Sequence, residues 1–338
     1  MQPPTGRGAV RPPIGIAFDG DAGNRIDALL AIAMLNGLTA KTQARRIALS
    51  VSRPSVASAQ IADVVAAFYR GAPAAGRGGG IGAASEGLIG LPESAAVSAD
   101  GPRLAAILSS KSADGTPTYT SSITGLVNTA ESSVMIRNLI LAQHDGNAAI
   151  VLAGPATGLV KILDLYRSGP QITAKVRALV VAAGTFPSGP AESSIKADVA
   201  AAKRLFAEWP TPIVAVGSEV GDALPYPGAS IEKDFAWSPA HPVVDGYRAY
   251  QPMPYDAPAP ALAAVLHAAF PDEGYFTLSE PGTITVLDDG RTRFAAQAEG
   301  KHRYLIVDPA QKARVLTEYT SLVSARPAPR PGRRGGGA

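Results

Sequence analysis

Short apolar runs alternate with amphipathic segments along most of the chain. The apolar runs, typical of buried strands, cover residues 14–18, 46–51, 148–153, 176–184, 211–217 and 303–308. Segments with apolar residues at helical spacing predict helices over 27–37, 54–68, 156–167, 197–208, 257–270 and 309–323. Strands that alternate with helices favour a mainly parallel sheet covered on both faces. The pattern therefore predicts a single large, doubly wound α/β domain over residues 14–325.

Two regions depart from this alternation. Residues 71–121 are rich in Gly, Ala, Ser and Pro, which predicts an irregular insert or active-site flap with one short helix around 103–110. Near the end of the chain, Asp289 and Gly290 stand between apolar flanks, which predicts a hairpin over 283–296. Neither region changes the predicted fold class.

Charge is distributed unevenly along the 338 residues, whose formal net charge is +3. Residues 1–13 carry two arginines and residues 326–338 carry four, both without an acidic residue, so the rest of the chain carries −3. Their Pro, Gly and Arg content predicts two disordered tails. The tails are either a weak arm for nucleic acid or an anionic surface, or solubilising low-complexity sequence. We favour the second alternative and expect no nucleic-acid partner.

Several classes of protein are excluded by composition. The chain has no cysteine, which excludes disulfides, zinc–thiolate sites and thiol nucleophiles. Its first apolar run, residues 28–35, is shorter than the ~20 residues that a membrane span needs. Residues 1–13 are proline-rich and polar, unlike a secretory signal. We therefore expect a soluble, cytoplasmic protein with no membrane partner.

Candidate chemistry follows the first predicted strand, where Asp19, Asp21 and Asp27 lie close together in the sequence. Ligands of open parallel sheets bind at the carboxyl ends of the strands. Three carboxylates gathered there repel one another unless they share a cation or a proton. Oxygen ligands would favour Ca²⁺ or Mg²⁺. The alternative is an Asp-rich turn in which Asp27 interacts with a helix dipole, and both remain open.

The segment IAFDGDAGNRIDALLAIAML resembles the N-terminal motif of the inosine–uridine-preferring nucleoside hydrolases, Asp-x-Asp-x-Gly-x-Asp-Asp-Ala. Segments 150–163, 191–206, 211–221 and 254–266 resemble later family segments in the same order, so the resemblance covers nearly all of 14–323. It implies the fold of that family, a nucleoside-like small-molecule ligand, and a homo-oligomer, either a dimer or a tetramer.

The resemblance also implies a site and a reaction. A calcium ion would be held by Asp21, Asp27, the backbone carbonyl of Ala153, and Asp256. Asp256 would also contact the substrate, Glu192 would hold the 5′-hydroxyl region of the ribose, and Asp19 would brace the loop. Asp21 would act as general base for a calcium-bound water that attacks C1′ and breaks the N-glycosidic bond.

The chain departs from the family mainly at ribose-binding positions. Two adjacent family aspartates are replaced by Ile26 and Asp27, and three family asparagines by Arg53, Gly158 and Ser194. Asn24 could supply one missing contact. Each lost hydrogen bond to a buried hydroxyl would weaken binding by ~1–3 kcal/mol. Two functions therefore remain: a divergent calcium-dependent N-ribohydrolase, or a non-catalytic or altered-ligand binding protein.

The roles of the two nearby arginines follow from their positions. Arg53 ends the second predicted strand and could bind an anion, a phosphate or a carboxylate. It could equally pair with Asp19 or Asp21 and replace the metal ion. For Arg25 we expect a solvated position.

A leaving-group acid is harder to assign. Tyr255 stands where the family has a histidine linked to leaving-group protonation. His241 could serve instead, or be an ordinary loop residue. Five aromatic residues crowd the same segment, 222–255, which family members use as a mobile lid. They either stack on a base or cover the edge of the core: Tyr226, Phe235, Trp237, Tyr247 and Tyr250.

Overall fold

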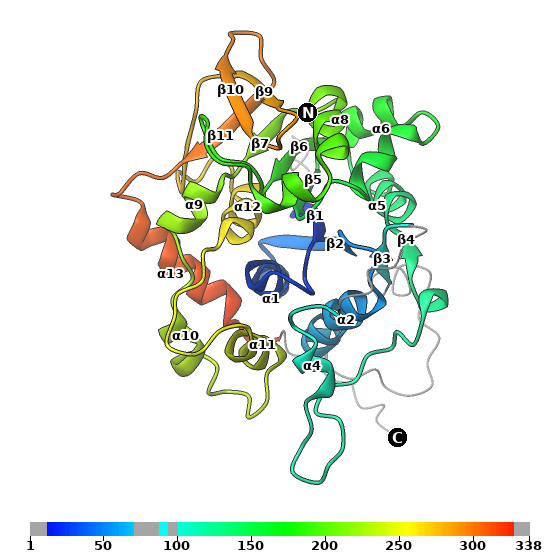
Figure 1. Ribbon diagram of the computed structural model, residues 1–338, viewed down its shortest axis with the longest axis vertical. Coiled ribbons are helices and arrows are strands. Elements are labelled where there is room, and N and C mark those ends of the chain that lie inside the picture. The colour runs from blue at the N-terminus through cyan, green and yellow to red at the C-terminus, as the bar shows by residue number, and fades with distance from the viewer. Residues whose placement is uncertain (1–11, 71–87, 94–100, 328–338) are drawn as a thin grey trace, which may run out of the picture.

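A mostly parallel sheet runs through the centre of the computed structural model, which describes residues 12–70, 88–93 and 101–327 (Figure 1). Its strands are β1 (Ile14–Gly20), β2 (Ala44–Val51), β3 (Ile89–Leu91), β4 (Ala130–Glu131), β5 (Ala148–Ala153), β6 (Val176–Val181), β7 (Ile213–Ala215), β8 (Thr277–Leu278), β9 (Gly282–Val286), β10 (Thr292–Ala296) and β11 (His302–Ile306). The predicted α/β fold is confirmed.

The strand order is β10-β9-β11-β7-β6-β5-β1-β2-β3-β4, with β8 paired to β11. Strand β1 lies between β5 and β2 and is parallel to both. Strands β8, β9 and β10 pair antiparallel at one end, where β9 and β10 form the predicted hairpin. The carboxyl ends of the parallel strands therefore meet at one edge of the sheet.

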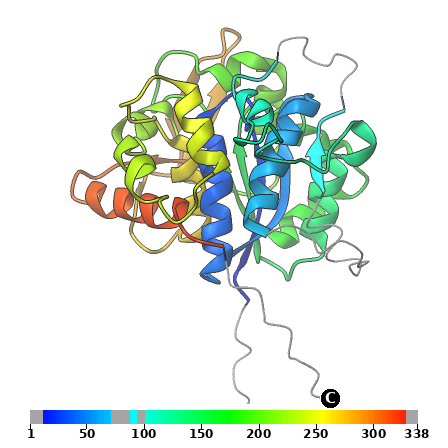
Figure 2. The same ribbon diagram turned by 90° about the horizontal axis from the view of Figure 1, so that it is seen from below.

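Helices cover both faces of the sheet, as Figures 1 and 2 show. They are α1 (Ile26–Ala40), α2 (Val56–Arg70), α4 (Ala106–Ser109), α5 (Ser132–Leu141), α6 (Ser168–Lys175), α7 (Ser193–Ala197), α8 (Val199–Glu208), α9 (Ser218–Ala223), α10 (Gly228–Lys233), α11 (Pro242–Tyr250), α12 (Pro260–Ala269) and α13 (Lys312–Val323), with 3-10 helices η1 (Leu126–Asn128) and η2 (Leu159–Asp164). The core on one face includes α1, α2, α11, α12 and α13, and the core on the other includes α5, α6, α8 and η2.

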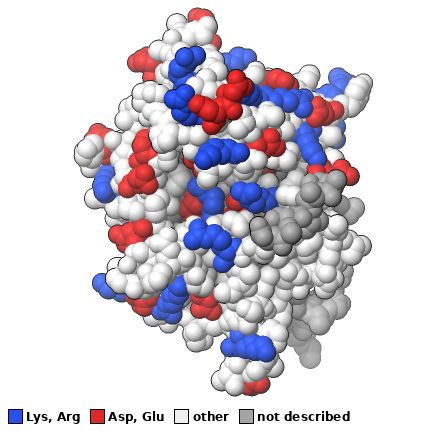
Figure 3. Space-filling model, viewed as in Figure 1, with Lys and Arg blue, Asp and Glu red and all other residues white. Residues whose placement is uncertain are grey.

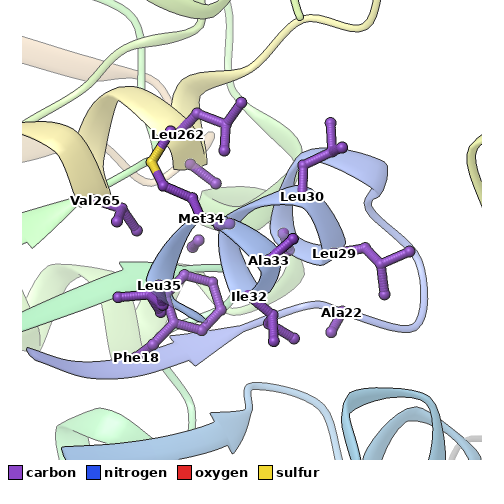
Figure 4. Close-up of a cluster of buried hydrophobic side chains, with 14 of the residues drawn as sticks. Phe18, Ala22, Leu29, Leu30, Ile32, Ala33, Met34, Leu35, Leu262 and Val265 are labelled. Atoms are coloured by element: carbon purple, nitrogen blue, oxygen red, sulfur yellow. The ribbon is translucent and has the colours of Figure 1, made fainter. Parts of the chain in front are cut away.

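Helix α1 is apolar on nearly all sides because it contacts α2, α11, α12 and α13 as well as the sheet. Figure 4 shows Phe18 of β1 beside Leu35, and Met34 reaching toward α12. Helix α13 passes so close that a Cβ atom on Gly37 would lie 2.1 Å from the carbonyl oxygen of Leu322. This packing fixes the start of α1, at Ile26, next to the carboxyl end of β1.

Some elements differ from the prediction. The segment expected to be a helix over 156–167 forms the 3-10 helix η2, and α6 begins only after Arg167, whose φ is 58°. Strands β3 and β4 extend the sheet beyond β2, although no strand was predicted there. They have three and two residues, too few to produce a hydrophobic period. The short helix expected around 103–110 is present as α4.

Some predictions lie outside the described residues. These include the disorder of both tails, most of which falls on residues 1–11 and 328–338, and the remainder of the proposed insert, at 71–87 and 94–100. In the described part of the chain, every helix is too short or too polar to cross a membrane.

Candidate functional site

The loop after β1 crosses the carboxyl end of β5 and carries Asp21 with it. The backbone N–H of Asp21 donates to the carbonyl oxygen of Ala153 at 3.0 Å. The two carboxylate oxygens of Asp21 accept from Asn24 Nδ2 at 2.7 Å and from Arg53 Nε at 2.6 Å. Of the two alternatives for Arg53, the structure therefore has an ion pair with Asp21.

Arg25 lies at the centre of the site, in contact with three side chains. Its Nε and Nη2 donate to the two oxygens of Asp27 at 3.1 and 3.0 Å. Its Nη1 donates to Glu192 Oε1 at 3.1 Å and to Ser194 Oγ at 3.0 Å. Only 19% of its side chain is exposed, so the expectation that Arg25 is solvated was wrong.

The electrostatics of Arg25 follow from these neighbours. Burial opposes its ionisation, but Asp27, followed by Glu192 and Asp21, keeps the pKa of Arg25 above its ordinary value. Glu192 is itself fixed, because its carboxylate accepts from the backbone N–H groups of Ser194 and Ile195 and caps α7. One guanidinium thus ties the start of α1 to the start of α7. We call the connected residues the central cluster: Asp21, Asn24, Arg25, Asp27, Arg53, Glu192 and Ser194.

Asp27 and Asp256 cap two further helices. Besides Arg25, Asp27 Oδ2 accepts from the backbone N–H of Ala261, in the first turn of α12, at 3.1 Å. A carboxylate there is stabilised by the helix dipole. Asp256 is exposed, and its Oδ1 accepts from the backbone N–H of Gly228 at the start of α10 at 2.8 Å. Both carboxylates have local structural partners.

These contacts test whether the site fits the calcium ion that the resemblance implies. Each of the four expected ligands has another partner: Arg53 and Asn24 for Asp21, Arg25 for Asp27, Gly228 for Asp256, and the Asp21 N–H for Ala153. Within the described ranges, no three Asp, Glu or His side chains form a group that could hold a metal ion. The two guanidinium groups supply the positive charge locally and would repel a divalent cation. The residues present do not fit calcium.

Asp19 points away from this network. It is fully buried on β1 opposite Ser50 of β2, and neither carboxylate oxygen has a hydrogen-bond partner among the described residues. Burial raises the pKa of Asp19 to about 7; the nearby Ser50 hydroxyl opposes this shift, and the negative charges of Asp21 and Glu131 add to it. The expected brace between Asp19 and the loop is therefore not seen as a side-chain hydrogen bond.

His241 does not lie at the site. It is buried among the rings of Phe68, Tyr69, Phe235 and Trp237, and its Nδ1 accepts from Val243 N–H at the start of α11. Phe68 is in the last turn of α2, and the helical rise places that turn about 20 Å from the Arg53 end. Burial lowers the pKa of His241 to about 3. It does not serve as a leaving-group acid in this arrangement.

The Tyr255 hydroxyl is also committed. It donates to the carbonyl oxygen of Tyr247 at 2.6 Å, the two rings stack at 4.4 Å, and burial raises the pKa of Tyr255. The segment expected to be a lid, 222–255, contains α10, α11 and the end of α9, and its residues Tyr226, Phe235 and Tyr247 belong to the core. For these aromatic residues, core packing is the alternative that the structure supports.

Arg103 lies at the outer side of the central cluster, where no sequence prediction placed it, and contacts Tyr250, one of the five aromatic residues of the 222–255 segment. The backbone N–H of Arg103 donates to Asn24 Oδ1 at 3.3 Å, and its Nη1 donates to the Tyr250 hydroxyl at 2.8 Å. The Arg103 guanidinium carbon lies 4.0 Å from the centre of the Tyr250 ring. Arg103 is 79 residues from Asn24 in a region without periodicity, so no local pattern could have predicted its place at the site. Arg25, in contrast, stands inside the Asp-rich motif, and its charge there was a usable signal.

Figure 3 shows the face onto which the strand ends open, with Lys and Arg side chains gathered over its middle. Although residues 14–325 carry a net charge of −3, the surface over the strand ends is therefore not acidic. The carboxylates of the central cluster lie beneath and are paired with arginine.

Solved structures similar to this one include nucleoside hydrolases. A purine-preferring ribonucleoside hydrolase from Gardnerella vaginalis matches with a TM-score of 0.65 at 17% identity, over 92% of this chain and 98% of that chain. An inosine–guanosine nucleoside hydrolase matches with a TM-score of 0.68 at 14% identity, over 92% and 98% of the two chains.

A further match is the type III effector protein XopQ in complex with adenosine diphosphate ribose. Its TM-score is 0.59 at 13% identity, over 93% of this chain and 96% of that chain. No protein-family model and no curated protein matches the sequence. At these identities the likeness shows the fold alone: the chain has the nucleoside hydrolase fold.

Proposed function

We propose that this chain uses the nucleoside hydrolase fold to bind a ribosyl ligand without calcium and without hydrolysing it. One observation carries the proposal: the Arg25 guanidinium is bonded to Asp27, Glu192 and Ser194. The family resemblance assigns these positions to the metal ion and the ribose. Because Arg25 bonds to Asp27, Glu192 and Ser194 together, these side chains are no longer available to a metal ion or to the ribose in the usual way.

The state of Asp21 supports the absence of hydrolysis. A general base must be able to take a proton from water. Both Asp21 oxygens already accept hydrogen bonds, one from Asn24 and the other from the Arg53 guanidinium. Neither oxygen is therefore free to accept a proton from an attacking water.

The fold remains suitable for ribosyl ligands other than a plain nucleoside. One similar structure is a complex with adenosine diphosphate ribose, a larger and more highly charged compound than a nucleoside. This supports binding as the retained property of the present chain. The calcium-dependent ribohydrolase is the function against which the proposal is tested.

The test measures ribose release and ligand binding on the same preparation. The full chain, incubated with inosine, uridine, adenosine and guanosine in millimolar calcium, should release no more reducing sugar than the Asp21→Ala variant. With a chelator present, adenosine diphosphate ribose should raise its Tm. Calcium-dependent ribose release that disappears in Asp21→Ala would overturn the proposal.

A further inference from the structure

The outer side of the central cluster presents donors that no protein acceptor uses. The Nε of Arg53 is bonded to Asp21, but its two terminal nitrogens have no hydrogen-bond partner among the described residues. The Arg53 side chain is 38% exposed. Its terminal nitrogens can therefore reach a molecule that arrives from solvent.

Arg103 lies beside the same loop and is held in place by four contacts, one of them made by its neighbour Leu104. The backbone N–H groups of Arg103 and Leu104 donate to Asn24 Oδ1 and to the carbonyl oxygen of Gly23, at 3.3 and 2.9 Å. Its guanidinium lies over the Tyr250 ring and bonds the Tyr250 hydroxyl through Nη1. Arg103 takes part in none of the ion pairs of the described residues. Its side-chain partner, the Tyr250 hydroxyl, is uncharged at neutral pH.

The charges at the site have a definite order from inside to outside. Asp21, Asp27 and Glu192 lie within the cluster, and Arg25 and Arg53 are paired with them. Arg103 and the free end of Arg53 face outward. Asn24 links the two arginines, because it bonds Asp21 through Nδ2 and the Arg103 backbone through Oδ1. An incoming ligand therefore meets guanidinium donors. The carboxylates of the cluster are all paired with arginine.

Guanidinium groups bind phosphate oxygens with paired, charge-assisted hydrogen bonds, and they do so better than they bind neutral hydroxyls. We propose that Arg53 and Arg103 bind the phosphate of a phosphorylated ribosyl compound, so that the site selects nucleotides and ribose phosphates over nucleosides. The inference rests on the proposed function and specifies its ligand class. Asn24 positions the two arginines relative to each other.

The experiment is isothermal titration of the full chain, in chelator, with AMP, ribose 5-phosphate, inorganic phosphate and adenosine. AMP should bind at least about tenfold more tightly than adenosine, because the two differ only in the phosphate. Ribose 5-phosphate should bind more tightly than inorganic phosphate, which shows that the ribose contributes. The variants Arg53→Gln and Arg103→Gln should each weaken AMP binding about tenfold or more, and each should remove most of the preference for AMP over adenosine.

Arg314→Gln is the matched control. Arg314 also lies over a tyrosine ring, that of Tyr275, at 4.2 Å, but on α13 and beyond the far end of α12. It should bind AMP as the parent chain does. Equal affinity for AMP and adenosine would overturn the phosphate inference and leave the proposed function standing. Binding of none of the four probes, or calcium-dependent ribose release, would overturn both.

Discussion

Arg25 changes the chemistry of the Asp-rich motif with a single side chain. A guanidinium offers five N–H donors in a planar fork, which suits a bidentate carboxylate and two further acceptors. Arg25 uses four of these donors, two along one edge on Asp27 and two of Nη1 on Glu192 and Ser194. At the residue scale, the site is an internal ion-pair network.

Removing this guanidinium should destabilise the fold. Arg25→Ala leaves Asp27 and Glu192 without their cation, and we expect the free energy of unfolding to fall by about 3 kcal/mol. Chemical denaturation measures it. Arg204 is the control, because it also bridges two carboxylates, Asp164 and Glu208, but on the surface. Arg204→Ala should cost less than about 1 kcal/mol, and equal losses for the two variants would contradict the account.

Asp19 predicts a pH dependence of stability. Its pKa is about 7 in the folded protein, above the value of 3.8 for an exposed carboxyl. Between these values the folded state keeps a proton that the unfolded state has released, so this contribution to stability is lost as the pH rises from about 4 to 7.

Asp19→Asn should remove that loss, because the amide stays neutral at every pH. The variant should therefore exceed the parent chain in stability at pH 8 by about 2 kcal/mol or more, and the difference should shrink toward pH 4. Denaturation at several pH values measures both curves. Parallel curves would show that Asp19 does not stay protonated in the folded state.

The sequence identified the acids of the site and offered Arg53 as a partner for Asp19 or Asp21, but it did not identify Arg25 as the partner of Asp27 and Glu192. Asp21 and Asp27 could be placed at the sheet edge, because they follow a strand whose burial is evident from its composition. Arg25 reaches Glu192, 167 residues away, and that contact depends on how α7 is placed against α1. Side-chain pairing of this kind is decided by tertiary packing, which a local pattern does not encode.

At the element scale, the long central strands and helices were predictable, and most of the short elements were not, with α4 and β7 as exceptions. Strands β1, β2, β5 and β6 and helices α1, α2 and α12 carry enough residues to show a pattern. Strands β3 and β4 are formed through pairing with their neighbours in the sheet. Residues 218–250 form three short helices, α9, α10 and α11. The proline and glycine residues of this region made it look like a loop in the sequence.

The approach of α13 to α1 yields a test of this packing. Gly37→Ala places a Cβ atom 2.1 Å from the Leu322 carbonyl oxygen, so we expect a loss of about 2 kcal/mol in spite of the higher helix propensity of alanine. Gly169 is the control, since a Cβ there would meet no atom within 4 Å. Because Pro170 follows Gly169 and disfavours helical backbone at a preceding residue with a Cβ atom, Gly169→Ala in α6 should change the free energy of unfolding by less than about 1 kcal/mol. A stabilising Gly37→Ala would contradict the close contact.

At the scale of the whole molecule, the cluster joins parts of the fold that are distant in sequence. Through Asp21, Asp27 and Glu192 it links the end of β1 to the starts of α1, α7 and α12. A metal ion at a sheet edge could make the same connections, and two arginines make them here. The negative charge of Asp21, Asp27 and Glu192 is thus neutralised by Arg25 and Arg53 of the same chain.

Calcium titration of the full chain tests this central claim most directly. Isothermal titration of the chelator-treated, dialysed protein should show no saturable calcium binding up to millimolar concentration, because Arg25 and Arg53 occupy the carboxylates that would hold the ion. Stoichiometric binding at micromolar calcium, lost in Asp21→Ala and Asp27→Ala, would contradict the account and restore the metal-dependent site.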